Sequence, residues 1–127
     1  MADAILVEGI VPAEPAAIFS AFLDAEAHGA MTGSAATDDG DGRFTAWGGY
    51  IQGQTLSTEA PHRIVQAWRT VDFPDDAPDS VLEIRLEAVD GGTRVTFAHA
   101  NIPAGQGVNY ESGWVDHYLD PMRAHFG

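Results

Sequence analysis

The stretch TDDGDGRFTAWGGY, residues 37–50, has the composition of a loop that could hold an ion. Asp39 and Asp41 alternate as the first ligands of a helix-flanked calcium loop do, but no acid follows where that loop needs its last ligand. A phosphate-binding loop would open a helix, whereas this one leads into the alternating residues of a strand. We therefore predict that Asp39 to Gly42 form a tight turn with positive φ angles.

Five histidines raise the question of a metal site. His117 and His125 lie eight positions apart, which in a helix separates them by about 12 Å and about 80°. Two ligands that must each lie about 2 Å from a zinc ion cannot easily share one across that distance. His99 could pair with His117 across a pocket, or it could be a structural, hydrogen-bonded histidine. His28 and His62 are expected at edges or turns, and no metal site is predicted.

The residues needed for nucleophilic catalysis are not found in the expected patterns. The sequence has no cysteine, no G-x-S-x-G motif and no serine at a strand-to-helix elbow. Most acidic residues fall on the polar phase of strands and helices or in turns, where they would be solvated and unsuited to acid-base work. No catalytic residue and no cofactor is predicted.

The three tryptophans, Trp47, Trp68 and Trp114, could be core residues or ligand contacts. Trp114 is the strongest pocket candidate because it lies in the last predicted helix, and Tyr118 follows it by one turn. Pro121 cannot donate a hydrogen bond to the carbonyl four residues earlier, so the helix should bend there. That bend could be a packing feature or the mouth of a pocket.

The elements that would position these residues begin with a strand and two short helices. AILVEGIV is apolar and rich in β-branched residues, and PAAIFSAFLD has the spacing of a helix. Asp24 is expected to cap a second helix that ends at Gly33. Strand-like segments follow at about 34–39, 43–58 as an interrupted pair, 62–72, 79–89 and 92–101.

In the clearest strand, Leu82, Ile84 and Leu86 alternate with charged residues, which predicts a sheet covered on one face. The DGGT sequence at 90–93 favours a tight hairpin. A final helix of about 20 residues then carries an apolar stripe at the spacing of an amphipathic helix. This stripe comprises Tyr110, Trp114, His117, Tyr118, Pro121 and Met122.

Composition limits the classes of partner. Nineteen acidic residues and six basic residues, all of them arginine, give a net charge of −13. This charge disfavours nucleic acid and anionic membrane surfaces, and the lack of lysine removes Schiff-base chemistry. No apolar run reaches the roughly 18 residues of a membrane span. The start MADAILVEG lacks the basic region of a secretory signal, so we expect a cytoplasmic, acidic protein of one domain, residues 1–127.

Several sequence words resemble those of a known family: GYIQGQTL, PHRIVQAWR, PDSVLEIRLEAVDGGTRVTFAHANIP and ESGWVDHYLDPM. They are similar to the family named for the activator of the heat-shock protein 90 ATPase. The stretch HGAMTGSAA resembles the small single-domain bacterial members in particular. This family belongs to the START-like, or SRPBCC, superfamily. The resemblance implies an α+β helix-grip (Bet v 1-like) fold. In that fold, two short helices follow the first strand, and about six or seven antiparallel strands wrap around a long C-terminal helix.

A curved sheet closed by one helix rarely fills its interior, so a pocket between the two is expected. We predict non-catalytic binding of a small hydrophobic molecule there, by a monomer or homodimer. The alternatives are a co-chaperone-like, protein-binding module, as the family name suggests, and an enzyme that uses the same pocket. The predicted pocket residues are Trp47, Trp68, Phe97, His99, Trp114, His117, Tyr118 and Met122.

Overall fold

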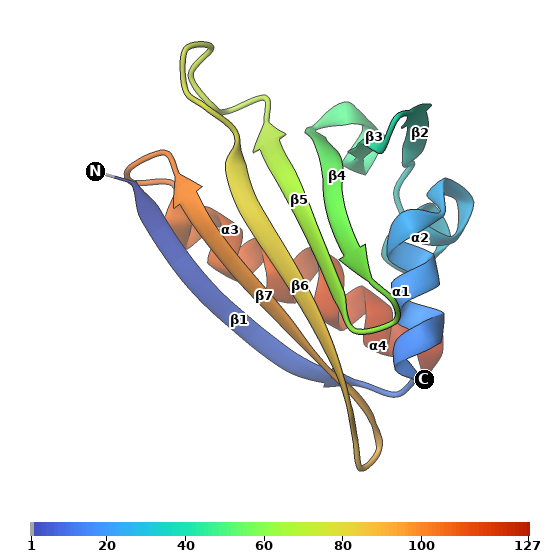
Figure 1. Cartoon of the computed structure of the whole chain (residues 1–127). Coiled ribbons are helices and arrows are strands. Elements are labelled where there is room, and N and C mark those ends of the chain that lie inside the picture. The colour runs from blue at the N-terminus through green and yellow to red at the C-terminus, as the bar shows by residue number, and fades with distance from the viewer. Residues whose placement is uncertain (1) are drawn as a thin grey trace.

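Seven antiparallel strands form one sheet that curves around the C-terminal helix in the computed structural model, which describes residues 2–127 (Figure 1). The strand order is β1-β7-β6-β5-β4-β3-β2. This confirms the predicted α+β helix-grip fold. The strands are β1 (Asp3–Val11), β2 (Thr37–Gly40), β3 (Arg43–Ala46), β4 (Ile51–Glu59), β5 (Arg63–Thr70), β6 (Ser80–Val89) and β7 (Gly92–Ile102).

The two faces of the sheet differ as the alternation in β6 predicts. Leu82, Ile84 and Leu86 point toward the helix and are at most 2% exposed. On the opposite face Glu83 forms ion pairs with Arg63 and Arg85. Exposed pairs of this kind contribute little stability, so burial of the helix-facing residues accounts for most of what holds the sheet in place.

Two short helices follow β1 and cover one end of the sheet: α1 (Pro15–Leu23) and α2 (Ala25–Thr32). The Asp24 carboxylate accepts a hydrogen bond of 2.9 Å from the backbone N–H of Ala27, and Gly33 ends α2 with a φ of 81°. Both predicted helix ends are thus confirmed.

The turn predicted within residues 37–50 is also confirmed. Gly40, Asp41 and Gly42 have φ angles of 88°, 54° and 78°, and they connect β2 to β3. The acidic residues of this segment belong to a hairpin turn.

The C-terminal helix is continuous but contains one wide turn. It comprises α3 (Gly107–Trp114), the π-helical segment η2 (Val115–Leu119) and α4 (Asp120–Phe126). Pro121 follows the wide turn, in the first turn of α4.

The wide turn changes which side chains face the sheet. Leu119, outside the predicted stripe, is 1% exposed, whereas His117 is exposed. The prediction that His117 lies on the buried stripe is therefore wrong. A π turn holds more residues than the 3.6 of an α-helix, which rotates the stripe by about one position.

Two histidines are part of the core. His99 is 1% exposed; it accepts a hydrogen bond from Trp114 Nε1 at 3.2 Å and contacts Ser80 Oγ at 2.8 Å. His28 lies 2.7 Å from the Tyr118 hydroxyl and 3.3 Å from the carbonyl of Phe22. Burial lowers the pKa of both imidazoles, that of His99 to about 3.

The expectation that His28 lies at an edge or turn is wrong, because this side chain is only 6% exposed. A histidine can be buried when both ring nitrogens have partners, and here Tyr118 and Phe22 supply them. His62 lies in the predicted turn and contacts the carbonyl of Leu86 at 3.1 Å.

Within the described residues, no helix is both long and apolar enough to cross a membrane.

The β6–β7 hairpin gives a matched pair of variants. Gly92 has a φ of 145°, and a Cβ added there would lie 2.9 Å from Pro12 Cα and would clash with the Val11 carbonyl. Gly91 has a φ of 86°, and a Cβ added there would have no neighbour within 4 Å. We expect Gly92→Ala to lower the free energy of unfolding by about 3 kcal/mol and Gly91→Ala by about 1 kcal/mol. Urea denaturation measures both; equal losses would contradict the predicted backbone clash.

Acid should destabilise the protein through His99. Its folded pKa of about 3 lies below the value of about 6.5 for an unfolded chain, so the unfolded state takes up a proton first. This contribution to stability is complete above pH 6.5 and is lost as the pH falls toward 3, by up to about 1.4 kcal/mol per pH unit. Denaturation curves at several pH values should show a smaller slope for His99→Gln. Parallel slopes would contradict the assignment.

Candidate functional site: a cavity beside the C-terminal helix

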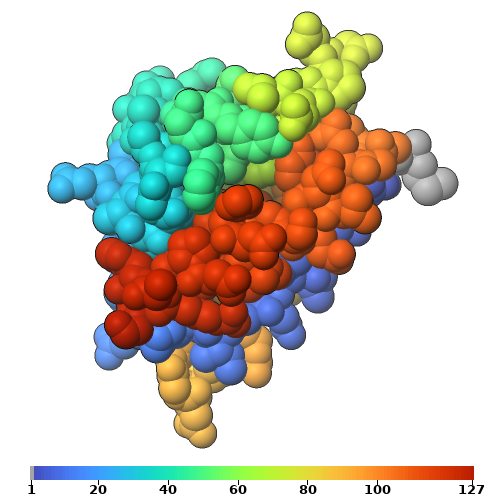
Figure 2. Space-filling view, turned by 180° about the vertical axis from the view of Figure 1, so that it is seen from behind, coloured from blue at the N-terminus to red at the C-terminus, as the bar shows by residue number. Residues whose placement is uncertain are grey.

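A cavity of about 350 Å³ lies between the C-terminal helix, strands β4 and β5, and the short 3-10 turn η1 (Trp47–Gly49). Figure 2 shows the helix, orange to red, crossing this side of the molecule next to the green and cyan segments that precede β5. The lining residues are Trp47, Tyr50, Ile51, Trp68, Asn109, Tyr110, Ser112, Gly113, Trp114, Asp116, His117 and Tyr118.

One wall of the cavity is the irregular part of the helix. Asn109, Tyr110, Ser112, Gly113 and Trp114 come from α3, and Asp116, His117 and Tyr118 come from the π-helical segment. A π turn widens the helix locally, and such turns are frequent at functional sites. Here the wide turn leaves His117 at the rim while Tyr118 reaches the interior.

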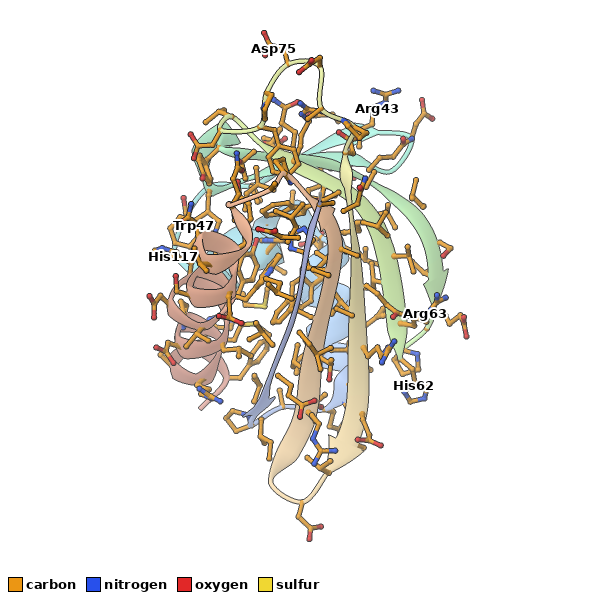
Figure 3. The ribbon with its side chains drawn as sticks, turned by 90° about the vertical axis from the view of Figure 1, so that its left-hand side faces the viewer. Arg43, Trp47, His62, Arg63, Asp75 and His117 are labelled. Atoms are coloured by element: carbon orange, nitrogen blue, oxygen red, sulfur yellow. The ribbon has the colours of Figure 1, made fainter. Side chains whose placement is uncertain are left out.

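The opposite rim is formed by the break between β3 and β4. Trp47, Gly48 and Gly49 have φ angles of 54°, 66° and 95°, and the Gly48 N–H donates to the carbonyl of Ala35 at 3.0 Å. A positive φ is unfavourable for a residue as large as tryptophan, at a cost of about 1–3 kcal/mol. This break turns the Trp47 side chain toward the helix, where its ring lies 5.0 Å from that of His117 (Figure 3).

Aromatic rings behind this rim form a contiguous cluster. The Trp68 ring lies 5.1 Å from that of Tyr110 and 5.5 Å from that of Trp114. Trp114 stacks on Phe97 at 4.4 Å and lies 4.9 Å from Tyr118. Each ring is held by several others, so the wall is pre-formed.

Three tyrosines bring hydroxyl groups to the cavity wall. Tyr50 donates a hydrogen bond of 2.6 Å to Asp72, and Tyr110 lies 2.7 Å from Thr70 Oγ1. Burial, aided by the contact with Asp72, raises the pKa of Tyr50 to about 12. Burial also raises the pKa values of Tyr110 and Tyr118. These phenols therefore stay protonated at neutral pH. Each is already hydrogen bonded within the protein, Tyr50 to Asp72, Tyr110 to Gln106 and Tyr118 to His28, which fixes the rings in place.

The indole N–H of Trp47 is a buried donor with no hydrogen-bond partner in the part of the chain that the structure describes. An unpaired buried donor is uncommon in folded proteins. Together with the unfavourable φ angle, it makes Trp47 the least well satisfied residue of the cavity wall.

Eight residues were predicted for the pocket, and the structure separates them into two groups. Trp47, Trp68, Trp114, His117 and Tyr118 line the cavity. Phe97, His99 and Met122 lie in the core behind it, at most 1% exposed. The suggested pairing of His99 with His117 is wrong, because His99 contacts Ser80 and Trp114.

Sequence reasoning missed Tyr50, Tyr110 and Asp116 as cavity residues. Tyr110 precedes Trp114 by one turn on the same stripe, so the helical spacing could have identified it. Tyr50 and Asp116 had no such signal, because their positions depend on the β3–β4 break and the wide helical turn.

The search for a metal site gave no candidate. Among residues 2–127, no three histidine, aspartate or glutamate side chains lie close enough together to hold an ion. The cavity has a mainly aromatic wall, with polar residues such as Asp116 and His117 at its rim.

Comparison with known proteins identifies the fold and the family. The sequence profile described as "Activator of Hsp90 ATPase homolog 1-like protein" matches residues 12–127. No curated protein matches the sequence. An HSP90 activator from Plasmodium falciparum has a similar structure with a TM-score of 0.80 and 27% identity, covering 98% of this chain and 94% of the other.

Two further solved structures show the same fold at lower identity. CalU16 from Micromonospora echinospora has a TM-score of 0.78 and 24% identity, with 99% of this chain and 77% of that chain covered. The Aha1 dimer from Colwellia psychrerythraea has a TM-score of 0.76 and 16% identity, with 96% of this chain and 95% of that chain covered. The match of the family profile to most of the chain confirms the resemblance seen in the sequence words: the chain belongs to the Activator of Hsp90 ATPase homolog 1-like family.

Proposed function

We propose that this protein binds a small, mainly apolar molecule in the cavity beside the C-terminal helix, without changing it chemically. The observation that supports this most directly is the cavity of about 350 Å³ with six tryptophan and tyrosine side chains in its wall. Small-molecule sites are typically concave, mostly apolar and roughly 300–1,000 Å³ in volume.

The packing around the cavity supports the proposal. Phe97 and Met122 are fully buried directly behind the wall, so the interior on that side is filled by side chains. The cavity is therefore a local feature of one end of the helix. Its position coincides with the two backbone irregularities of the fold, the π-helical segment and the β3–β4 break.

The tyrosines of the cavity are better suited to binding than to acid-base catalysis. A general base or nucleophile should have a pKa near the operating pH. The pKa values of Tyr50, Tyr110 and Tyr118 are shifted upward, away from neutral pH. Their protons are already donated within the protein, to Asp72, Gln106 and His28, so these residues serve as a fixed aromatic wall.

The second candidate function is regulation of an Hsp90-type ATPase. It is favoured by the 27% identity with the Plasmodium falciparum HSP90 activator over nearly the whole chain. Protein binding would use an exposed apolar surface. Leu6, Ile10 and Val81, which are 61%, 44% and 44% exposed on the sheet face away from the helix, are apolar residues available for such a contact.

Filling the cavity should abolish ligand binding and leave the fold intact. Gly113 lines the cavity on α3, and a Cβ added there would have no neighbour closer than His117 at 4.0 Å. Because leucine also favours a helix by about 0.5–1 kcal/mol over glycine, Gly113→Leu should be at least as stable as the wild type. Binding is measured by the fluorescence of Trp47, Trp68 and Trp114, since all three line the cavity.

The matched control is Ala124→Leu, which adds a similar side chain at an exposed helical position away from the cavity. Native mass spectrometry of each purified variant reports any co-purifying molecule. If Gly113→Leu binds the same molecules as the wild type, the cavity is not the binding site.

The chaperone candidate predicts a different outcome. If the protein acts on an Hsp90-type chaperone through its outer sheet face, its addition should raise the rate of ATP hydrolysis, and Leu6→Asp should reduce the effect. Gly113→Leu should then behave as the wild type. Under the ligand-binding proposal we expect no change in the ATPase rate with any of these proteins.

A further inference from the structure

We propose that the ligand of this cavity is cationic: an amine or quaternary ammonium group carried on an apolar body. This inference rests on the proposed ligand-binding function and specifies the chemical class of the ligand. It is carried by three observations: the aromatic wall, the placement of charges around the cavity and the net charge of the chain.

The aromatic wall is suited to a cation. The face of an aromatic ring carries partial negative charge, so a cation within about 6 Å of the ring centre is attracted, most strongly by tryptophan. Six tryptophan and tyrosine side chains line the cavity, and the Trp68 ring lies within 6 Å of the rings of both Trp114 and Tyr110. A group that enters this space meets several rings at once.

The fixed charges at the cavity are negative. Asp116 lines it directly, and Asp72 lies at the Tyr50 hydroxyl, to which it is hydrogen bonded at 2.6 Å. As far as residues 2–127 are concerned, no arginine lines the cavity, and the sequence has no lysine.

The six arginines lie elsewhere in the fold. The arginines on the strands of the sheet pair mostly with carboxylates of the outer face. Arg123 on α4 forms an ion pair with Asp120 and donates a hydrogen bond to the Ile10 carbonyl. The six arginines are Arg43, Arg63, Arg69, Arg85, Arg94 and Arg123. An anionic ligand would thus lose its hydration at the cavity without gaining a positively charged partner.

The net charge of the chain also favours a cationic ligand. A net charge of −13 produces a negative potential around the protein, which attracts cations and repels anions. A neutral ligand would match the rings but would gain nothing from Asp116. A cation with an apolar body gains from the rings, from the carboxylate and from the overall field.

Three probes of similar size test the inference: benzyltrimethylammonium, its uncharged carbon isostere neopentylbenzene, and phenylacetate. Their affinities are measured by quenching of tryptophan fluorescence in the full-length protein. We expect the cation to bind about tenfold more tightly than the isostere, and phenylacetate to bind most weakly. The affinity of the cation alone should fall as the salt concentration rises.

A matched pair of variants separates the local carboxylate from the overall charge. Asp116→Asn and Glu111→Gln remove one negative charge each from the same helix, but only Asp116 lines the cavity. Asp116→Asn should weaken binding of the cation about fivefold and leave the isostere unchanged, while Glu111→Gln should change either by less than about twofold.

Three results of these binding measurements would contradict the inference. Tighter binding of the isostere or of phenylacetate would overturn the inference and leave the ligand-binding function standing. Equal effects of Asp116→Asn and Glu111→Gln on the cation would also overturn it. If none of the three probes binds, both the inference and the proposed function are contradicted, because neopentylbenzene is an apolar molecule that the cavity should accept.

Discussion

The contact of Trp114 with strand β7 is the interaction on which the rest of the structure depends. Its ring stacks on Phe97 at 4.4 Å, and its indole N–H donates to the buried His99. One side chain therefore fixes both the distance and the rotation of the C-terminal helix over the sheet. With the helix held there, the strands to either side curve around it, and the core residues of β6 and β7 lose their contact with water.

The cavity arises where this regular packing stops. Beyond Trp114 the helix widens into a π turn, and on the facing side the chain breaks between β3 and β4 with three consecutive positive φ angles. Neither wall can then fill the space between them, although the rings of Trp47 and His117 meet at the rim. A positive φ is energetically unfavourable at Trp47, and π turns are frequent at functional sites, so both features support the proposal that the cavity is functional.

Membership of the Hsp90 ATPase activator family describes the fold more closely than the activity. The same sheet and helix could present an outer surface to a protein or an inner cavity to a small molecule. In this chain the inner cavity has the more specific chemistry. Its wall combines aromatic rings with Asp116, whereas the outer face carries ion pairs interspersed with single exposed apolar residues such as Leu6.

The sequence by itself determined the approximate positions of the strands, the ends of α2 and the buried side of β6. Leu82, Ile84 and Leu86 alternate with charges, and Asp24 and Gly33 have the chemistry of helix ends, so local rules sufficed. The tertiary structure decided which aromatic residues reach the cavity. Phe97 and His99 share the face of β7 that the helix covers, and Trp114 packs over them in the core. Tyr50 reaches the cavity because the chain breaks between β3 and β4, and Asp116 reaches it because the helix widens into a π turn. Such rotations follow from packing between distant segments, which periodicity along one segment does not encode.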